Sequence, residues 1–135
     1  MNSVGKHYIV EIHGCDPAKL NSPEIIKSVM EGAALAANAT ILHSFFHQFS
    51  PQGVSGVVVI SESHLTIHTW PEFGYAAADV YTCGEHTSPQ KAVEYLQDNL
   101  KSDLMHIVHM TREAGMEPMV VPTIEFDYRE RVLEE

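Results

Sequence analysis

Short runs of β-branched and aromatic residues, several of them alternating with polar ones, make up most of this chain. Such runs are typical of β-strands. They predict strands at about 8–13, 40–49, 53–60, 65–70 and 75–83, with further strand-like sequence at 105–110 and around 119–126. Pro51-Gln52-Gly53 and Pro71-Glu72-Phe73-Gly74 separate them as turns. The charged segment 128–135 is expected to be frayed or loosely helical.

Two segments change to the helical period. Each begins with serine followed by proline, Ser22-Pro23 and Ser88-Pro89. Serine is a favourable N-cap, and proline suits the first helical position because its missing N–H costs nothing there. One apolar face follows each start, formed by Ile25, Ile26, Val29, Met30, Ala33, Ala36 and Ala37 in the first helix, and by Ala92, Val93, Leu96 and Leu100 in the second.

The order of these elements predicts the fold class. Strand, helix and strand recur as two similar β-α-β units, and short turns join most of the strands. We therefore expect one α+β domain over residues 1–135, a two-layer sandwich with an antiparallel sheet and both helices on one face. The other face of the sheet needs a cover. A second copy would provide it and give a four-layer αββα homodimer.

Composition narrows the possible partners. The net charge is −10, from 18 acidic and 8 basic residues, so nucleic acid and anionic membranes are not expected to bind. The N-terminus leads into strand-like sequence rather than the apolar region of a signal peptide, and no apolar run is long enough to span a membrane. We therefore expect a cytoplasmic protein in which Cys15 and Cys83 are free thiols, either of which could be chemically available.

The sequence SESHLTIHTWPE, residues 61–72, is unusually polar for a strand. Its hydroxyl groups could simply face solvent while Leu65 and Ile67 pack in the core. A metal site is a second interpretation, because His43/His47 and His64/His68 are pairs four residues apart. Neither pair is part of a His-Glu-x-x-His motif, and the chain has no Cys-x-x-Cys motif, so no metal is expected.

Backbone self-cleavage is the third interpretation of this stretch. A serine hydroxyl can attack the preceding carbonyl when that peptide is strained and the oxyanion is stabilised. Elimination of the resulting ester, followed by hydrolysis, leaves a pyruvoyl group at a new N-terminus. This chemistry needs a base, and histidine titrates near neutrality. Glu62-Ser63 and His68 supply these groups, although the spacing alone has low specificity.

Longer motifs resemble those of one family. Residues 53–72, with Gly74-Tyr75-Ala76-Ala77 and residues 79–84 (Asp-Val-Tyr-Thr-Cys-Gly), closely resemble bacterial and archaeal S-adenosylmethionine decarboxylase proenzymes. The resemblance extends upstream through Phe46-His47-Gln48-Phe49 to Gly14-Cys15-Asp16 and Gly5-Lys6-His7. It covers most of residues 4–100 and ends near Leu104.

The resemblance implies specific roles. Cleavage between Glu62 and Ser63 would give a β chain of residues 1–62 and an α chain of residues 63–135 that begins with the pyruvoyl cofactor. By this resemblance, His68 is the base of the processing reaction and Ser55 assists self-processing. Cys83 donates a proton to carbon during decarboxylation. Phe49 stacks on the adenine, and Glu72 binds the ribose hydroxyls. Trp70 could bind the cationic sulfonium or pack in the core. Cys83 could likewise be a small buried apolar residue.

Successive residues of a β-strand point to opposite faces of the sheet, and this limits which of these residues can come together within one chain. In an extended strand, Ser63 shares a face with Leu65 and Ile67, whereas His68 shares the other face with His64. A chain should therefore not bring its own His68 to its own Ser63. The resemblance implies a site shared between protomers, with Ser63 and Cys83 from one. Phe49, Ser55, His68 and Glu72 would come from the other.

Alternatives remain for the substrate and for activity. A pyruvoyl group forms a Schiff base with an α-amine and accepts the electrons released on decarboxylation. The substrate could therefore be S-adenosylmethionine, whose decarboxylated product serves spermidine synthesis, or arginine or ornithine. An uncleaved, non-catalytic homologue is a further alternative. The joint presence of Ser63, His68 and Cys83 argues against it.

Overall fold

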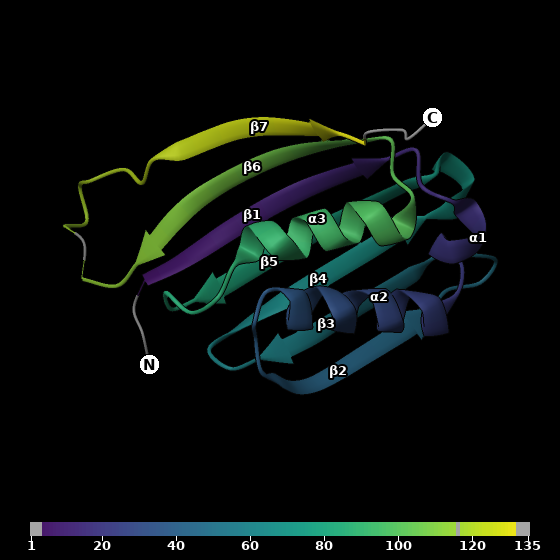
Figure 1. Cartoon of the computed structure of the whole chain (residues 1–135), viewed down its shortest axis with the longest axis horizontal. Coiled ribbons are helices and arrows are strands. Elements are labelled where there is room, and N and C mark those ends of the chain that lie inside the picture. The colour runs from purple at the N-terminus through teal and green to yellow at the C-terminus, as the bar shows by residue number, and fades with distance from the viewer. Residues whose placement is uncertain (1–3, 116, 132–135) are drawn as a thin grey trace.

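The computed structural model describes residues 4–115 and 117–131, and these form an α+β fold. Seven strands make one antiparallel sheet in the order β2-β3-β4-β5-β1-β6-β7 (Figure 1). The strands are β1 (Val4–His13), β2 (Ile41–Gln48), β3 (Val54–Ile60), β4 (Ser63–Trp70), β5 (Tyr75–Cys83), β6 (Leu104–Glu113) and β7 (Ile124–Glu130). The helices are α1 (Pro17–Leu20), α2 (Pro23–Ala36) and α3 (Pro89–Leu100), with a 3-10 turn η1 (Pro71–Phe73).

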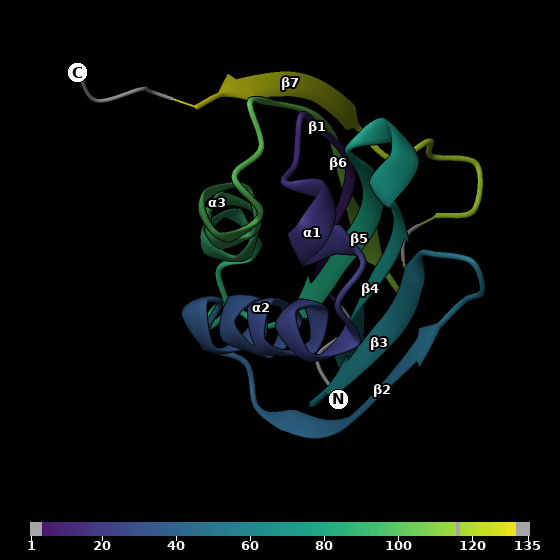
Figure 2. The ribbon, with the colours of Figure 1, turned by 90° about the vertical axis from the view of Figure 1, so that its right-hand side faces the viewer.

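The helices cover one face of the sheet, as predicted, and leave the other face open (Figure 2). The α2 helix begins at Pro23, where the Ser22 side chain accepts a hydrogen bond from the Ile25 N–H at 3.2 Å. The α3 helix begins at Pro89, and the Ser88 side chain makes no capping hydrogen bond. The longest helix has 14 residues, and no helix in the described residues is long and apolar enough to cross a bilayer.

The core lies between the sheet and the helices. Alternate residues of the strands point into it, among them Val10, Val58, Leu65 and Val80, which are at most 1% exposed. Burial in β4 alternates as the parity argument requires, because Leu65, Ile67 and Thr69 are buried while His68 and Trp70 are exposed. The residues at the alternate positions of the strands, such as His68 and Trp70 in β4, therefore line the open face.

The C-terminal part of the chain differs from the prediction. Residues 119–123 are not a strand. The last strand instead comprises residues 124–130, part of which we expected to be frayed or helical. The strand forms because β7 pairs with β6 from Met110–Ile124 to Leu104–Glu130, and the Gln97 amide of α3 donates to the Arg129 carbonyl at 2.8 Å. Residues 132–135 of the expected tail lie outside the described residues. The short helix α1 was not predicted.

Candidate active site

The Glu62–Ser63 peptide bond joins the loop of the β3–β4 hairpin to the first residue of β4. Ile60 pairs with Ser63, so Ser61 and Glu62 form a two-residue loop. Glu62 has φ of +74°, in the left-handed region that glycine occupies at no steric cost. Holding a glutamate there costs on the order of 1–3 kcal/mol. Backbone strain is therefore stored beside the bond that the sequence predicts to be cleaved.

The Ser63 hydroxyl is buried and has no hydrogen-bond partner in the described part of the chain. The same is true of Thr82 Oγ1, and the His64–Tyr81 register places Thr82 opposite Ser63. A buried hydroxyl without a partner costs about 1–3 kcal/mol, so each such group needs an explanation, of which a catalytic role is one and an ordered water molecule is another. Within the described residues, Ser63 Oγ makes no hydrogen bond that would compete with its attack on its own preceding carbonyl. The residue is therefore suited to conversion into a pyruvoyl group.

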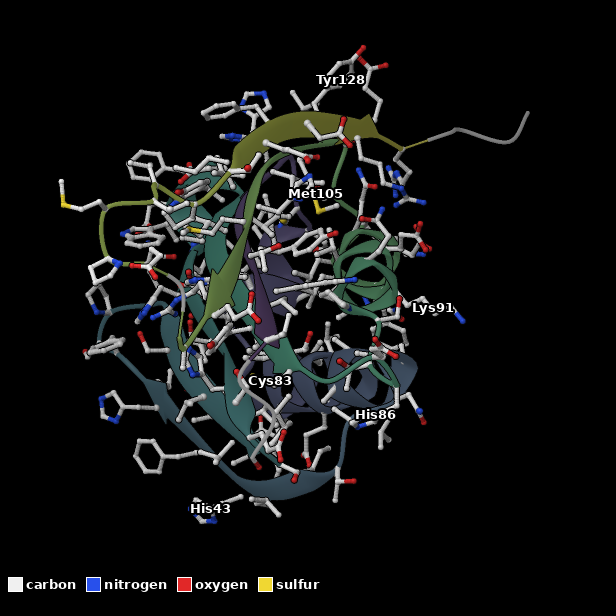
Figure 3. All side chains as sticks on the ribbon, turned by 90° about the vertical axis from the view of Figure 1, so that its left-hand side faces the viewer. His43, Cys83, His86, Lys91, Met105 and Tyr128 are labelled. Carbon is white, nitrogen blue, oxygen red and sulfur yellow. The ribbon has the colours of Figure 1, made fainter. Side chains whose placement is uncertain are left out.

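Cys83 lies at the end of β5, one residue beyond the position opposite Ser63, and Figure 3 shows it at this end of the sheet. It is a free thiol and 6% exposed. Cys15, also free and buried, donates to the Ile12 carbonyl, and burial raises the pKa of its thiol to about 12, assisted by the Asp103 charge. Burial therefore limits the access of reagents to Cys15, which is 5% exposed, and favours its protonated form.

Ser55 and His68 form a pair on the open face. They are directly opposite each other in β3 and β4, and Ser55 Oγ lies 2.7 Å from His68 Nδ1. If Nδ1–H donates to Oγ, Nε2 keeps its lone pair and can accept a proton. A shallow pocket of about 230 Å³ surrounds the pair, also lined by Phe45, His47 and Thr66.

The predicted substrate-binding residues lie at the same end of the sheet as His68. Phe49 follows β2, is 49% exposed and meets the His47 ring edge-on at 4.7 Å. Trp70 ends β4 and is 40% exposed, so the alternative that it packs in the core is wrong. Its ring lies 5.3 Å from that of Tyr75. Glu72 is exposed in η1. An aromatic platform and a carboxylate are thus available together.

The predicted residues fall into two groups at opposite ends of the strands. The turn before Ser63 and the end of β5 lie at one end, whereas the β2–β3 loop and η1 lie at the other (Figure 1). Ser63 and His68 are separated by roughly 17 Å along β4, at about 3.4 Å per residue. Their side chains also point to opposite faces of the sheet. One chain therefore does not bring its own serine and histidine together.

A polar cluster at the centre of the open face was not predicted. Asp79 Oδ1 lies 3.1 Å from His7 Nε2, and the Thr66 hydroxyl donates to Asp79 Oδ2 at 3.1 Å. His64 lies beside this cluster, and burial lowers its pKa, with His7 and Arg112 adding to the shift and Asp79 opposing it. The alternation of polar residues in the strands is the signal that could have found this cluster.

A second missed contact lies near Trp70. The Tyr75 hydroxyl donates to Glu11 Oε2 at 2.6 Å, and burial together with this carboxylate raises the pKa of Tyr75 to about 12.

Among the described residues, no group of three or more histidine, cysteine or acidic side chains is arranged to hold a metal ion.

Comparison with known proteins identifies the family. The sequence profile described as S-adenosylmethionine decarboxylase matches residues 6–113. The S-adenosylmethionine decarboxylase proenzyme of Acetivibrio thermocellus is 51% identical over 124 residues, which is 92% of this chain and all of that protein. The proenzyme of Thermotoga petrophila is 53% identical over 112 residues, 83% of this chain and 86% of the relative.

Comparison with solved structures points to the same family. The crystal structure of the adenosylmethionine decarboxylase from Aquifex aeolicus superposes with a TM-score of 0.70 at 32% identity, covering all of this chain and 96% of that one. A Trypanosoma brucei structure, at 15% identity and a TM-score of 0.56, covers 78% of this chain and 45% of its own, which is a likeness of fold alone. The chain belongs to the S-adenosylmethionine decarboxylase family, whose members are pyruvoyl-dependent carboxy-lyases.

Proposed function

We propose that this chain is a proenzyme that cleaves itself at Glu62–Ser63 and then decarboxylates S-adenosylmethionine, giving the aminopropyl donor for spermidine synthesis. The observation that carries the proposal is the unpaired, buried hydroxyl of Ser63 directly after the strained Glu62, in a chain of this family.

Processing begins at Ser63. Its Oγ attacks the Glu62 carbonyl carbon, the C–N bond breaks, and an ester replaces the amide. A base then removes the Ser63 Cα proton while the Oγ–Cβ bond breaks. Glu62 is released as a carboxylate, and a dehydroalanine remains on the second chain. Its hydrolysis releases ammonia and leaves the pyruvoyl group on residues 63–135, separate from residues 1–62.

The base in this proposal is the partner's copy of His68. Within one chain, His68 lies at the far end of β4 from Ser63 and on the other face. A homodimer that buries the open faces against each other would place the partner's His68 against the open-face side of the backbone at residue 63, where the base removes the Cα proton. This face carries exposed apolar side chains, including Ile9, Phe45, Val59 and Phe126. Such side chains are typical of a surface that another protein covers.

In the shared site, the substrate would be held between two protomers, with Phe49 and Glu72 from the partner of the protomer that supplies residue 63 and Cys83. Phe49 offers an aromatic face for the adenine, Glu72 a carboxylate for the ribose hydroxyls, and Trp70 a cation–π contact for the sulfonium. Cleavage frees residue 63 from the β3–β4 turn, so the new N-terminus can turn toward Cys83 on the open-face side. The pyruvoyl group supplies the electron sink for loss of carbon dioxide. Cys83 then donates a proton to the substrate α-carbon.

Release of carbon dioxide from carboxyl-labelled substrates tests the function directly. The purified protein is expected to decarboxylate S-adenosylmethionine and to leave arginine and ornithine unchanged, while the Ser63→Ala variant has no activity. Glu72→Gln should raise KM about tenfold or more with little change in kcat, because a hydrogen bond to a charged group contributes about 1.5–3 kcal/mol. Activity toward arginine or ornithine instead would overturn the substrate assignment. Inactivity toward all three would favour a non-catalytic homologue.

A further inference from the structure

The Tyr81 side chain lies on the open face of β5, two residues before Cys83. Gly5 of β1 is the Cα partner of Cys83. A Cβ at Gly5 would lie 2.5 Å from Cε2 of Tyr81 and 2.8 Å from its hydroxyl oxygen. The ring thus occupies the space that any larger residue at position 5 would fill. Its hydroxyl is thereby held over the position directly opposite Cys83.

Three neighbouring strands hold this ring. The His7 ring of β1 is 5.4 Å from it, the His64 ring of β4 is 5.7 Å away, and the Arg112 guanidinium of β6 lies 4.6 Å from the ring centroid. Asp79 in turn fixes His7. Arg112 at this distance makes a cation–π contact. The ring is therefore positioned by contacts that do not involve Cys83.

The Tyr81 hydroxyl and the Cys83 thiol lie on the same face of β5, and the hydroxyl reaches over Gly5, the Cα partner of Cys83. Burial raises the pKa of Tyr81, and the neighbouring Cys83 raises it further, while Arg112 opposes the shift. A protonated phenol at this place can donate a hydrogen bond to the sulfur. Thr82 cannot take this role, because strand alternation places it on the helix-facing side.

We propose that Tyr81 is a positioning residue that orients the Cys83 thiol and stabilises the thiolate left when Cys83 gives its proton to carbon. The role of the thiol rests on the proposed function, but the contact between the two side chains does not. The charged and titratable groups that face this pair are His7, Asp79, His64 and Arg112. They are present in every variant below, so that any change reports the hydroxyl.

Alkylation of Cys83 by iodoacetamide measures the thiolate at each pH. The protein is the full-length Ser63→Ala variant, which cannot be cleaved, and peptide mass mapping separates Cys83 from Cys15. Tyr81→Phe should move the midpoint of the pH–rate curve upward by about one unit, since a hydrogen bond to a charged group contributes about that much. Tyr8→Phe, the same change on the other face of β1, should leave the midpoint in place.

Gly5→Ala provides a second, independent variant. It keeps the hydroxyl but displaces the ring, and it should raise the midpoint in the same direction, with circular dichroism confirming the fold. An unchanged midpoint in Tyr81→Phe, or an equal shift in Tyr8→Phe, would overturn the proposal. Because the assay uses uncut protein, failure of the decarboxylase assignment would appear separately, as absent carbon dioxide release by the wild-type chain.

Discussion

Ser55 Oγ and His68 Nδ1 lie 2.7 Å apart across β3 and β4, on the opposite face and at the opposite end of β4 from Ser63. In each chain, the serine that we propose as the nucleophile therefore lies away from the histidine that we propose as the base. A second copy of the chain would supply the missing group to each.

A shared site predicts complementation between two inactive variants. Ser63→Ala and His68→Ala should each remain uncut when expressed alone. Coexpressed with different tags and purified as a heterodimer, they form one site with an intact Ser63 from the His68→Ala chain and an intact His68 from the other. The His68→Ala chain should then be cleaved. A heterodimer in which both chains stay intact would contradict the shared site.

Ser55→Ala should slow self-cleavage about tenfold, as expected for loss of one hydrogen bond that orients the imidazole. Cleavage half-times from denaturing gels provide the measurement. Ser44→Ala, a serine of the neighbouring strand β2, serves as the matched control and should cleave at the wild-type rate. Equal rates in Ser55→Ala and the wild type would show that His68 needs no orientation by this contact.

The strain at Glu62 predicts a difference between glycine and alanine. Both substitutions remove the side chain, but only glycine adopts φ of +74° without strain. In the Ser63→Ala background, Glu62→Gly should be more stable to urea than Glu62→Ala by about 1 kcal/mol. With Ser63 present, Glu62→Gly should cleave more slowly, since less strain is released. Faster cleavage in the glycine variant would mean that the strain does not drive the reaction.

Cys15 predicts a loss of stability at alkaline pH. Its pKa is about 12 when folded, raised by burial from an ordinary value of 9.0. The unfolded thiol therefore ionises first, so its contribution is complete below pH 9 and declines as the pH rises toward 12. From pH 8 to pH 10, the free energy of unfolding should fall by about 1 kcal/mol more in the wild type than in Cys15→Ala. Parallel declines in urea titrations would refute this origin.

Local sequence rules predicted the parts of the fold that depend on neighbouring residues. The serine–proline pairs located the starts of α2 and α3, and alternation placed Leu65 inside and His68 outside. They failed at β7, because that strand is defined by its pairing with β6 and its contact with α3 rather than by its own pattern.

The candidate site was predictable only in part. Motif resemblance supplied Ser63, His68 and Cys83, and parity alone indicated that Ser63 and His68 lie apart. The Tyr81 ring over Gly5 depends on the register between β1 and β5, whose paired residues are 64 to 78 positions apart in the chain. The Asp79 cluster likewise joins three strands. No local pattern encodes such long-range contacts.

The intact mass of the purified protein, denatured and reduced, tests self-cleavage at Ser63 most directly. We expect two chains, residues 1–62 and residues 63–135, the second lighter by one ammonia than its serine form. Ser63→Ala should give one full-length chain. A single uncut wild-type chain of 15.0 kDa, or a cut that leaves serine at residue 63, would contradict the pyruvoyl mechanism.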